Sequence, residues 1–489
     1  MSQEFAAVVA AAIDGRTHNV FHRQTQLQSL HETLRNETSA IRSAILSDTD
    51  ATSVEAAIEL YTTIKSVADA FYSLQPLESL EEEYLIAKGK NAVSHREPLG
   101  IVYIEPTQHT GFYSCISTIS SAIAAGNCIV ILLERNLRET NAVLRRVLTS
   151  ALEPDSFVIA DEPGASKLPL DQSISVLQNG DEQLPRSNQL VSSSSSSSKV
   201  VAFVDRTADL RLAARELVAA RFSFGGRSPY APDLVLVNEF AREEFLGAVV
   251  QECVRYGRTE LSKANGQLRH EKKSTASGIE TSVNELRMLD AGLKIIAQEA
   301  RYAVVELASR QDLLGNRLRS PVLAIYPIRS LDDGLAIVDH NTSSPCTAAY
   351  HFGTPETGKY LCQFVPAAAS FVNHVPRQLL LGPAAPLNQP INLDVRYPYT
   401  MFTHPRPQYA VPNNESIRLE KALYSADSTC AEILARDAFK PLSVTKRHNG
   451  KGVGFFELGF LINASMILAG TVFGTVTGAY LFYSRSRRG

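Results

Sequence analysis

The chain has 489 residues, a formal net charge of −3 at pH 7, a hydrophobic fraction of 44% and a charged fraction of 20%. This length exceeds one ordinary hydrophobic core, so two or more packed lobes are expected. The composition is that of a globular protein, and the charge gives no electrostatic basis for nucleic-acid binding. The 6 cysteines are scattered without a C-x-x-C pair. This pattern favours reduced core thiols, and neither a metal site nor a disulfide framework is expected.

The N-terminal region predicts two amphipathic helices. The segment Met1 to Asp14 carries acidic residues and no basic cluster before its Ala/Val run, which is not typical of a signal peptide. Residues 16–46 then place apolar side chains on one helical face, namely Phe21, Leu27, Leu30, Leu34, Ile41 and Ile45. A second helix is expected from Ser53 to Leu74, with Val54, Ile58, Tyr61, Ala68 and Phe71 turned inward.

Strand and helix patterns then alternate. A strand is expected at Ile101–Ile104, a helix at Phe112–Ala125 and a buried strand at Cys128–Leu133. A helix at Arg138–Leu152 and a strand at Phe157–Ile159 follow. This βαβαβ order predicts a doubly wound, Rossmann-type sheet.

The second half starts after a serine run, Ser192–Ser198, that is typical of a flexible linker or loop. A strand is expected at Val201–Asp205, followed by a helix that ends near Ala220. A turn on Gly225-Gly226 then leads through Ala231-Pro232-Asp233 into an apolar strand. The region from Phe240 to Arg310 is expected to be mostly helical.

Several of these strings resemble the aldehyde dehydrogenase superfamily, especially its fatty-aldehyde branch. They are Glu97-Pro98-Leu99-Gly100, Ala122 to Asn127, Gly226 with Ala231-Pro232-Asp233 and a strand, and Phe402 to Arg406. The resemblance covers about residues 1–410. It implies an aldehyde dehydrogenase-like α/β fold with two doubly wound Rossmann-type lobes. The implied domains are a cofactor-type domain over 1–200, a catalytic-type domain over 201–395, a bridging and oligomerisation segment with a linker over 396–453, and a tail over 454–489.

The resemblance also shows which catalytic positions have changed. The family's nucleophilic cysteine falls at Pro229, its general-base glutamate at Ser195, and the asparagine that donates to the oxyanion at His109. Proline has neither a nucleophile nor a backbone N–H. Ser228 is adjacent to Pro229, but a serine needs a base to become a nucleophile. No catalytic position of the family is therefore expected to be intact.

The positions that hold NAD or NADP in the family have changed as well. The two ribose-contacting residues, a lysine and a glutamate, fall at Leu132 and Arg317. The phosphate turn is reduced to Gly180, beside acidic neighbours, and Lys199 matches a family lysine. Gly180 and Lys199 are the remaining candidates for cofactor contact, and weak or absent binding of NAD or NADP is expected.

The segment Leu458–Tyr483 is apolar and uncharged, which predicts a transmembrane helix. Glycines at 470, 474 and 478 form a small-residue stripe. Some fatty-aldehyde dehydrogenases carry a similar tail. We expect a C-terminal tail anchor that contacts membrane lipid, with the bulk of the chain facing the cytosol. The endoplasmic reticulum, mitochondrial outer and peroxisomal membranes all stay open, and the family resemblance implies a homodimer.

Three functions follow from these patterns. The first is a membrane-anchored aldehyde dehydrogenase-like protein that has lost catalysis and serves binding or assembly. The second is an active NAD(P)-dependent oxidation of hydrophobic, fatty or aromatic aldehydes to carboxylic acids at a membrane. In that case Cys115 and Cys253 would be the first candidates for a displaced nucleophile. The third is a redox-active carrier that keeps only cofactor binding.

Overall fold

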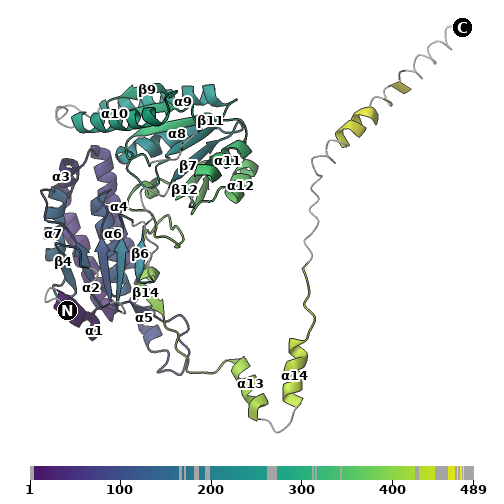
Figure 1. The fold of residues 1–489 in the computed structure, drawn as a ribbon. Coiled ribbons are helices and arrows are strands. Elements are labelled where there is room, and N and C mark those ends of the chain that lie inside the picture. The colour runs from purple at the N-terminus through teal and green to yellow at the C-terminus, as the bar shows by residue number, and fades with distance from the viewer. Residues whose placement is uncertain are drawn as a thin grey trace. The chain divides into compact units, whose positions relative to one another are not determined.

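The computed structural model describes residues 5–164, 168–169, 172–180, 187–192, 199–261, 272–310, 313, 317–341, 344–424, 429–445, 461–468, 471, 474–475 and 477. Met1–Val411 forms one compact unit, and Pro412–Gly489 forms a second one. The two units are described separately below. Figure 1 gives the order of the elements along the chain.

Five helices begin the first unit: α1 Ala6–Asp14, α2 Val20–Asn36, α3 Thr38–Asp48, α4 Ser53–Tyr72 and α5 Pro76–Glu83. The single helix expected over 16–46 is therefore two helices. The break follows from Thr38, whose hydroxyl donates to the backbone carbonyl of Arg35 at 2.7 Å and so competes with the helical ladder. The expected apolar face from Leu27 to Ile45 is buried, whereas Phe21 is 49% exposed and was wrongly placed on it.

The inward face of α4 differs from the expected one at three positions, whereas Phe71 packs partly buried against the core as expected. Val54, Ile58 and Tyr61 are 41%, 42% and 66% exposed, so they face solvent. The buried positions are Ala56, Glu59, Leu60, Thr63 and Val67. The reason is that α4 packs along α6, which is buried over almost its whole length and whose small and polar side chains allow a close approach.

The first sheet has five parallel strands in the order β4-β3-β2-β5-β6. Their bounds are β2 Ile101–Glu105, β3 Cys128–Leu132, β4 Phe157–Ala160, β5 Ser173–Leu177 and β6 Gln189–Val191, with α6 Gly111–Ala125 and α7 Glu139–Ala151 between them. Val102 and Ile104 lie in one hydrophobic cluster with α2, α4, α6 and α7, whereas Ile101 and Tyr103 pack on the other face with α1. Helices therefore cover both faces, which confirms the doubly wound sheet.

The second sheet has seven strands in the order β13-β12-β7-β8-β11-β10-β9. The strands are β7 Val200–Val204, β8 Leu234–Asn238, β9 Lys294–Glu299, β10 Tyr302–Glu306, β11 Val322–Ile328, β12 Ala348–Phe352 and β13 Ser370–Val372. The helices are α8 Leu210–Phe222, α9 Arg242–Leu261, α10 Lys272–Leu289, α11 Leu331–Asn341 and α12 Pro355–Phe364. Side chains of α8 and α9 cover one face, and those of α10, α11 and α12 cover the other. Of these strands only β9 is antiparallel to its neighbour, and the β9–β10 hairpin lies where mostly helix was expected.

A two-stranded antiparallel sheet joins β1 Arg96–Pro98 to β14 Thr403–Pro405. The residues after β14 continue along the same segment, because the backbone N–H of Ala92 donates to Gln408 and the side chain of Asn91 accepts from Val411. The end of the first unit is therefore held to a segment more than three hundred residues earlier, as the sequence separation of 320 between Asn91 and Val411 shows.

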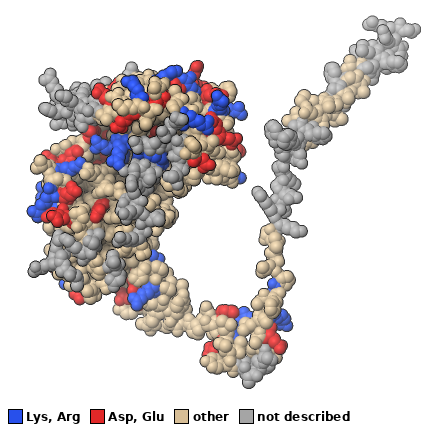
Figure 2. Space-filling model, viewed as in Figure 1, with Lys and Arg blue, Asp and Glu red and all other residues tan. Residues whose placement is uncertain are grey.

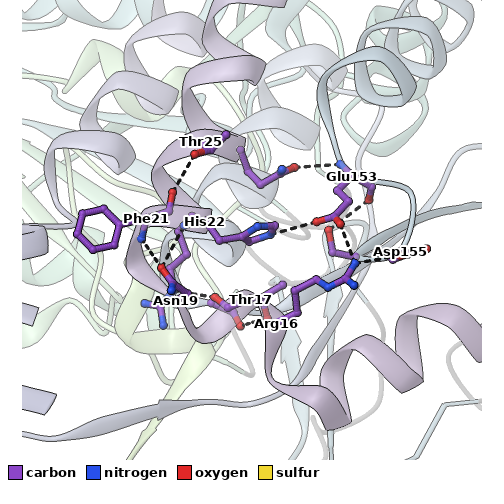
Figure 3. A network of polar contacts seen from close by, with 12 residues as sticks. Arg16, Thr17, Asn19, Phe21, His22, Thr25, Glu153 and Asp155 are labelled. Carbon is purple, nitrogen blue, oxygen red and sulfur yellow. Dashed lines mark hydrogen bonds and ion pairs between the residues drawn. The ribbon is translucent and has the colours of Figure 1, made fainter. Parts of the chain in front are cut away.

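The start of α2 is tied to the turn between α7 and β4 by a polar network (Figure 3). Asn19 caps α2 by accepting from the backbone N–H of Phe21 at 2.8 Å. Arg16 donates to Glu153 at 2.7 Å and to Asp155 at 3.0 Å. This network positions the N-terminal helices on the first sheet.

The second unit begins with a pair of helices, α13 Asn414–Tyr424 and α14 Thr429–Ala438, joined by an ion pair of 2.7 Å between Arg418 and Asp437. More than half of the predicted membrane segment Leu458–Tyr483 lies outside the described residues, and of its four glycines only Gly474 is among them. In the part of the chain that is described, no helix has both the length and the apolar character to cross a membrane.

Candidate functional site

A cavity of about 610 Å³ lies within the first unit. Its walls include the loops after β2 and β5, the loops before β8 and β11, the segment from the end of α3 to α4, and residues 382–384. The cavity thus meets the carboxyl edge of the five-stranded sheet and the amino edge of the seven-stranded one. In the five-stranded sheet the strand order reverses between β2 and β5, which is where open α/β sheets usually bind ligands. We take this cavity as the candidate site.

The predicted nucleophile position lies on its wall. After α8 the backbone is left-handed at Phe224, Gly225 and Gly226, with φ of 52°, 65° and 67°. A Cβ on Gly226 would come within 2.5 Å of the carbonyl oxygen of Ser320, so only glycine fits. This turn brings Pro229 to the cavity. The residue there offers neither a thiol nor a backbone donor.

Ser228 does not replace the missing nucleophile. The residue is only 1% exposed, and its hydroxyl oxygen accepts from the backbone N–H of Tyr230 at 3.2 Å. Among the described residues, no hydrogen bond joins this hydroxyl to a histidine or a carboxylate. A serine without a base is a weak nucleophile. Ser195, the position of the family's general base, lies outside the described residues.

His109 lies in the same cavity, and its hydrogen bond decides what it can donate. The ring nitrogen Nε2 is 2.9 Å from the carbonyl oxygen of Leu380, which can only accept, so Nε2 carries the proton. Burial, and secondarily the nearby arginines, lower the pKa of His109 to about 4. The ring is therefore neutral near pH 7, and its single N–H is already used. His109 cannot replace the family's oxyanion donor in this arrangement.

Behind Pro229 lies a cluster of buried charges. Arg221 is fully buried, donates to the carbonyl oxygens of Leu318 and Ser320 at 2.7 Å, and pairs with Asp233 at 3.5 Å. Burial lowers the pKa of Arg221 to about 10, so it stays charged at neutral pH. Arg317 donates to the carbonyl oxygen of Ser228 at 3.0 Å.

The predicted cofactor positions are distributed over the amino edge of the seven-stranded sheet and the carboxyl edge of the five-stranded sheet. Arg317 is on the cavity wall, whereas Lys199 is buried next to the start of β7, where burial lowers its pKa. Leu132, at the end of β3, lines a second cavity of about 280 Å³ at the carboxyl edge of the five-stranded sheet. Gly180 follows β5 with a φ of 75°, but it lines neither of these cavities.

The second cavity is where the family would hold NAD or NADP, and its described residues fit such a cofactor poorly. Leu132 cannot donate a hydrogen bond to a ribose. Glu105 and Glu134 place carboxylates on the wall that a diphosphate would approach, and Arg138 already donates to Gln108 at 2.9 Å. Negatively charged side chains in the cavity lining oppose the binding of a negatively charged diphosphate. No reaction step through a nicotinamide follows from this arrangement.

Glu59 is a site residue that the sequence analysis missed. It lines both cavities, is 3% exposed, and accepts from the backbone N–H of Tyr113 at the start of α6 at 3.3 Å. Burial raises its pKa to about 7. The signal was present, because Ala56, Thr63 and Val67 share its helical face, but the larger apolar residues of the opposite face dominated the interpretation.

The two cysteines considered as displaced nucleophiles are unsuited to that role. Cys115 lines the second cavity but is 2% exposed, and burial strongly raises its pKa. Cys253 is 1% exposed on α9, and burial raises its pKa to about 12. A thiol with a raised pKa supplies almost no thiolate at neutral pH.

Comparisons with known proteins agree with this architecture. Residues 4–159 match the family model described as Aldehyde dehydrogenase family. A 4,4'-diaponeurosporen-aldehyde dehydrogenase of Staphylococcus aureus is 23% identical over 362 residues, which are 68% of this chain and 75% of that protein. Aldehyde dehydrogenase family 3 member B1 of Mus musculus is 21% identical over 345 residues, which are 67% of this chain and 73% of that protein.

Among solved structures, the substrate-bound state of Staphylococcus aureus AldH aligns with a TM-score of 0.67 at 17% identity, over 90% of this chain and 99% of that one. The fold and the position of the cavity thus define an aldehyde dehydrogenase-like α/β protein. Together with the family match over residues 4–159 and the relatives from family 3, they confirm the predicted resemblance to the aldehyde dehydrogenase superfamily.

Proposed function

We propose that this chain is a membrane-anchored aldehyde dehydrogenase-like protein without dehydrogenase activity, which serves binding or assembly. The observation that carries the proposal is Pro229 on the cavity wall, at the position of the family's nucleophile. The bond from His109 to Leu380 supports it, because it occupies the only N–H of the ring. Covalent aldehyde oxidation needs a nucleophile that is activated in the site, and the described cavity residues supply none.

The test is an activity assay on the full chain with octanal or benzaldehyde and with NAD or NADP. We expect no aldehyde-dependent rise in the absorbance of reduced cofactor. Turnover at roughly one per second, the low end of ordinary enzymes, would instead support oxidation of hydrophobic aldehydes, which is the alternative function.

Restoring the thiol alone should leave the protein inactive. Pro229→Cys adds a nucleophile, but the oxyanion donor and the base stay absent, and a missing oxyanion donor alone costs about two to three decades in rate. We expect no turnover from Pro229→Cys and at most a trace after His109→Asn and Ser195→Glu are added. Full activity of Pro229→Cys would contradict this account of the site.

Cofactor binding is proposed to be weak or absent. Replacement of the two ribose contacts by Leu132 and Arg317 removes about 2–5 kcal/mol of binding free energy, or roughly one and a half to three and a half decades of affinity. Calorimetric titration with NAD and with NADP measures this directly. A dissociation constant in the micromolar range would overturn this part of the proposal, and would favour the redox-active carrier if aldehyde oxidation were still absent.

The membrane anchor and the dimer are proposals as well. The uncharged segment Leu458–Tyr483, followed by arginines, supports a tail anchor in a membrane that faces the cytosol. A chain cut before Gly454 should no longer pellet with membranes after an alkaline wash, and continued pelleting would exclude the anchor. Homodimerisation, as in the superfamily, is tested by light scattering of that cut chain, for which a strict monomer is the contradicting result.

A further inference from the structure

The helix pair of the second unit, α13 and α14, has no buried side chain. The two helices contact each other through the ion pair of 2.7 Å between Arg418 and Asp437. No described residue from 412 to 445 is buried. Figure 2 shows charged and uncharged side chains side by side on this surface. Helices of 11 and 10 residues are marginal in water unless an apolar face is covered, so this pair requires a further surface.

Large apolar side chains are exposed on the pair and directly after it. On α13, Leu419 and Leu423 are four residues apart and share one face, and Leu423 is 80% exposed. Tyr424, at the end of α13, is 86% exposed. After α14, Phe439 and Leu442 are 84% and 94% exposed. Exposed apolar side chains that recur in this way on a short segment mark an interaction surface.

The place of the pair in the chain identifies a lipid surface as the partner. Residues 439–457 separate α14 from the uncharged segment Leu458–Tyr483, the proposed transmembrane anchor. A stretch of this length reaches at most about 70 Å even when it is fully extended. Insertion of the anchor therefore keeps the pair at a high local concentration next to the bilayer, where a weak apolar contact is sufficient for occupancy.

The charges that follow α14 complement anionic lipid. The side chain of Lys440 is 72% exposed. Residues 440–456 contain no acidic residue and four basic ones, which are Lys440, Lys446, Arg447 and Lys451. A basic segment close to a transmembrane helix is attracted to negatively charged headgroups. The exposed Tyr424 suits the same surface, because tyrosines are enriched at the boundary between membrane and water.

We propose that α13, α14 and the residues after them, up to Thr445, lie on the surface of a bilayer that contains anionic lipid. Leu423, Phe439 and Leu442 insert between the headgroups, and the ammonium group of Lys440 contacts the anionic headgroups. The inference rests on the proposed membrane anchor, which brings the bilayer within reach of the pair. It adds a contact along the bilayer surface to the contact through the anchor, and it does not depend on the loss of dehydrogenase activity.

The chain contains no tryptophan, which allows a direct test. The full-length variant Phe439→Trp is reconstituted in vesicles of phosphatidylcholine and phosphatidylserine, with and without lipids that carry bromine on their acyl chains. Bromine quenches tryptophan fluorescence at short range. We expect about a twofold loss of emission in the brominated vesicles, because an interfacial helix buries its apolar face about 5–10 Å into the boundary between headgroups and acyl chains. The control is Phe240→Trp, at a residue of the first unit that is 79% exposed, which should lose much less emission.

The same measurement distinguishes lipid from the other partners. Unquenched emission from Phe439→Trp in vesicle-bound chains would overturn the lipid contact. A blue shift without quenching would show that a protein surface, such as a second copy of the chain, covers the residue, and would also overturn it. Equal quenching of Phe439→Trp and Phe240→Trp would overturn the assignment to the helix pair. Vesicles of phosphatidylcholine alone should give less quenching, and equal quenching would refute the role of anionic lipid.

Further variants locate the inserted side chains. Leu423→Ser and Leu442→Ser change exposed residues, so the fold should be kept, and together they should lower the quenching of Phe439→Trp. The matched control is Leu77→Ser, at a residue of α5 that is 77% exposed, which should leave the quenching unchanged. Unchanged quenching after both serine substitutions would refute the insertion of these leucines.

An alkaline wash of the same vesicles separates this inference from the proposed anchor. Retention of the full chain after the wash without quenching of Phe439→Trp would keep the anchor and refute the lipid contact of the helix pair. Quenching before the wash in chains that the wash then removes would refute the anchor and keep the contact of the pair.

Discussion

Glu59 is a carboxyl group that the fold holds out of water beside the site. Burial raises its pKa from 4.5 to about 7. Because the folded state holds this proton more tightly than the unfolded chain, the stability of the fold decreases as the pH rises from about 4.5 to about 7. The shift corresponds to about 3 kcal/mol of unfolding free energy, fully lost only above pH 7.

We therefore expect Glu59→Gln to be more stabilising at pH 8 than at pH 5, since the amide keeps an acceptor for Tyr113 and removes the buried charge. Urea denaturation of both proteins at the two pH values measures the difference. Glu83→Gln, an exposed change at the end of α5, is the control and should show little pH dependence of this kind. Equal effects of Glu59→Gln at both pH values would show that the carboxylate is not held in this way.

The thiols give a second prediction at the residue scale. Cys362 is exposed and Cys430 is partly exposed, whereas Cys115, Cys128, Cys253 and Cys346 are buried. Burial raises the pKa of each of the four buried thiols. Alkylation of the native chain with iodoacetamide should therefore modify Cys362 first and leave Cys115 and Cys253 unmodified, as read by peptide mass spectrometry. Fast modification of Cys115 would reveal a reactive thiol beside the cavity.

The sequence shows which family positions hold a different residue in this chain. It does not show what surrounds those residues in the fold. Pro229 and His109, which the motif spacing singled out, both line the cavity. The spacing could not show that the ring of His109 donates to Leu380, because that partner is 271 residues away in the chain. The charge cluster of Arg221, Asp233 and Arg317 was hidden for the same reason, since its members meet only after the seven-stranded sheet has formed.

At the scale of elements, the start of α4 connects two parts of the site. Glu55 closes a capping box with Thr52, in which its side chain accepts from the backbone N–H of Thr52 at 2.8 Å. The other carboxylate oxygen of Glu55 accepts from the backbone N–H of Phe224 at 2.6 Å. One side chain thus holds both the helix cap and the left-handed turn that leads to Pro229.

We expect Glu55→Ala to lower the unfolding free energy by about 2–4 kcal/mol, because a cap contributes about 1 kcal/mol and a hydrogen bond to a charged group about 1.5–3 kcal/mol. Thr52→Ala removes only one half of the cap and should cost about 1 kcal/mol. Denaturant unfolding of both variants gives the comparison. If the two variants lose the same free energy, the contact between Glu55 and Phe224 contributes nothing to stability.

Element type was predicted well where the apolar pattern was long and regular, as in β2, β3 and α6. The prediction failed where a neighbouring element determines which face of a helix is buried. Ile58 is the larger apolar residue, yet Glu59 is buried, because the N-terminal N–H groups of α6 supply its hydrogen bonds. The β9–β10 hairpin was missed because Lys294 to Glu299 is half polar and pairs as an edge strand with one neighbour.

For the molecule as a whole, the family motifs were sufficient to predict two doubly wound lobes, because each motif marks a strand end or a helix end. Strand β14 shows what the motifs do not reveal. Phe402 to Arg406 was recognised as a family string, but its pairing with Arg96–Pro98 follows only from the structure. That pairing determines where the first unit can be cut.

A chain that ends at Val411 should fold like the full chain, whereas one that ends at Arg396 should not. The longer form keeps the β1–β14 pair and the bonds from Asn91 to Val411. The shorter one loses Tyr397 and Phe402, which are 1% and 0% exposed in the core of the first sheet. Removal of one buried Phe side chain typically costs about 3–5 kcal/mol.

Guanidinium unfolding and limited proteolysis of the two truncated chains test this division. We expect the chain ending at Val411 to unfold at the same midpoint as the full chain, because Met1–Val411 is a compact unit by itself. The chain ending at Arg396 should unfold at a clearly lower midpoint and be digested rapidly. Since the same cut also exposes Asn127, whose side chain donates to the carbonyl oxygen of Phe402 at 3.0 Å, the loss should extend to the start of β3. A stable, protease-resistant chain ending at Arg396 would show that strand β14 is not needed for the fold.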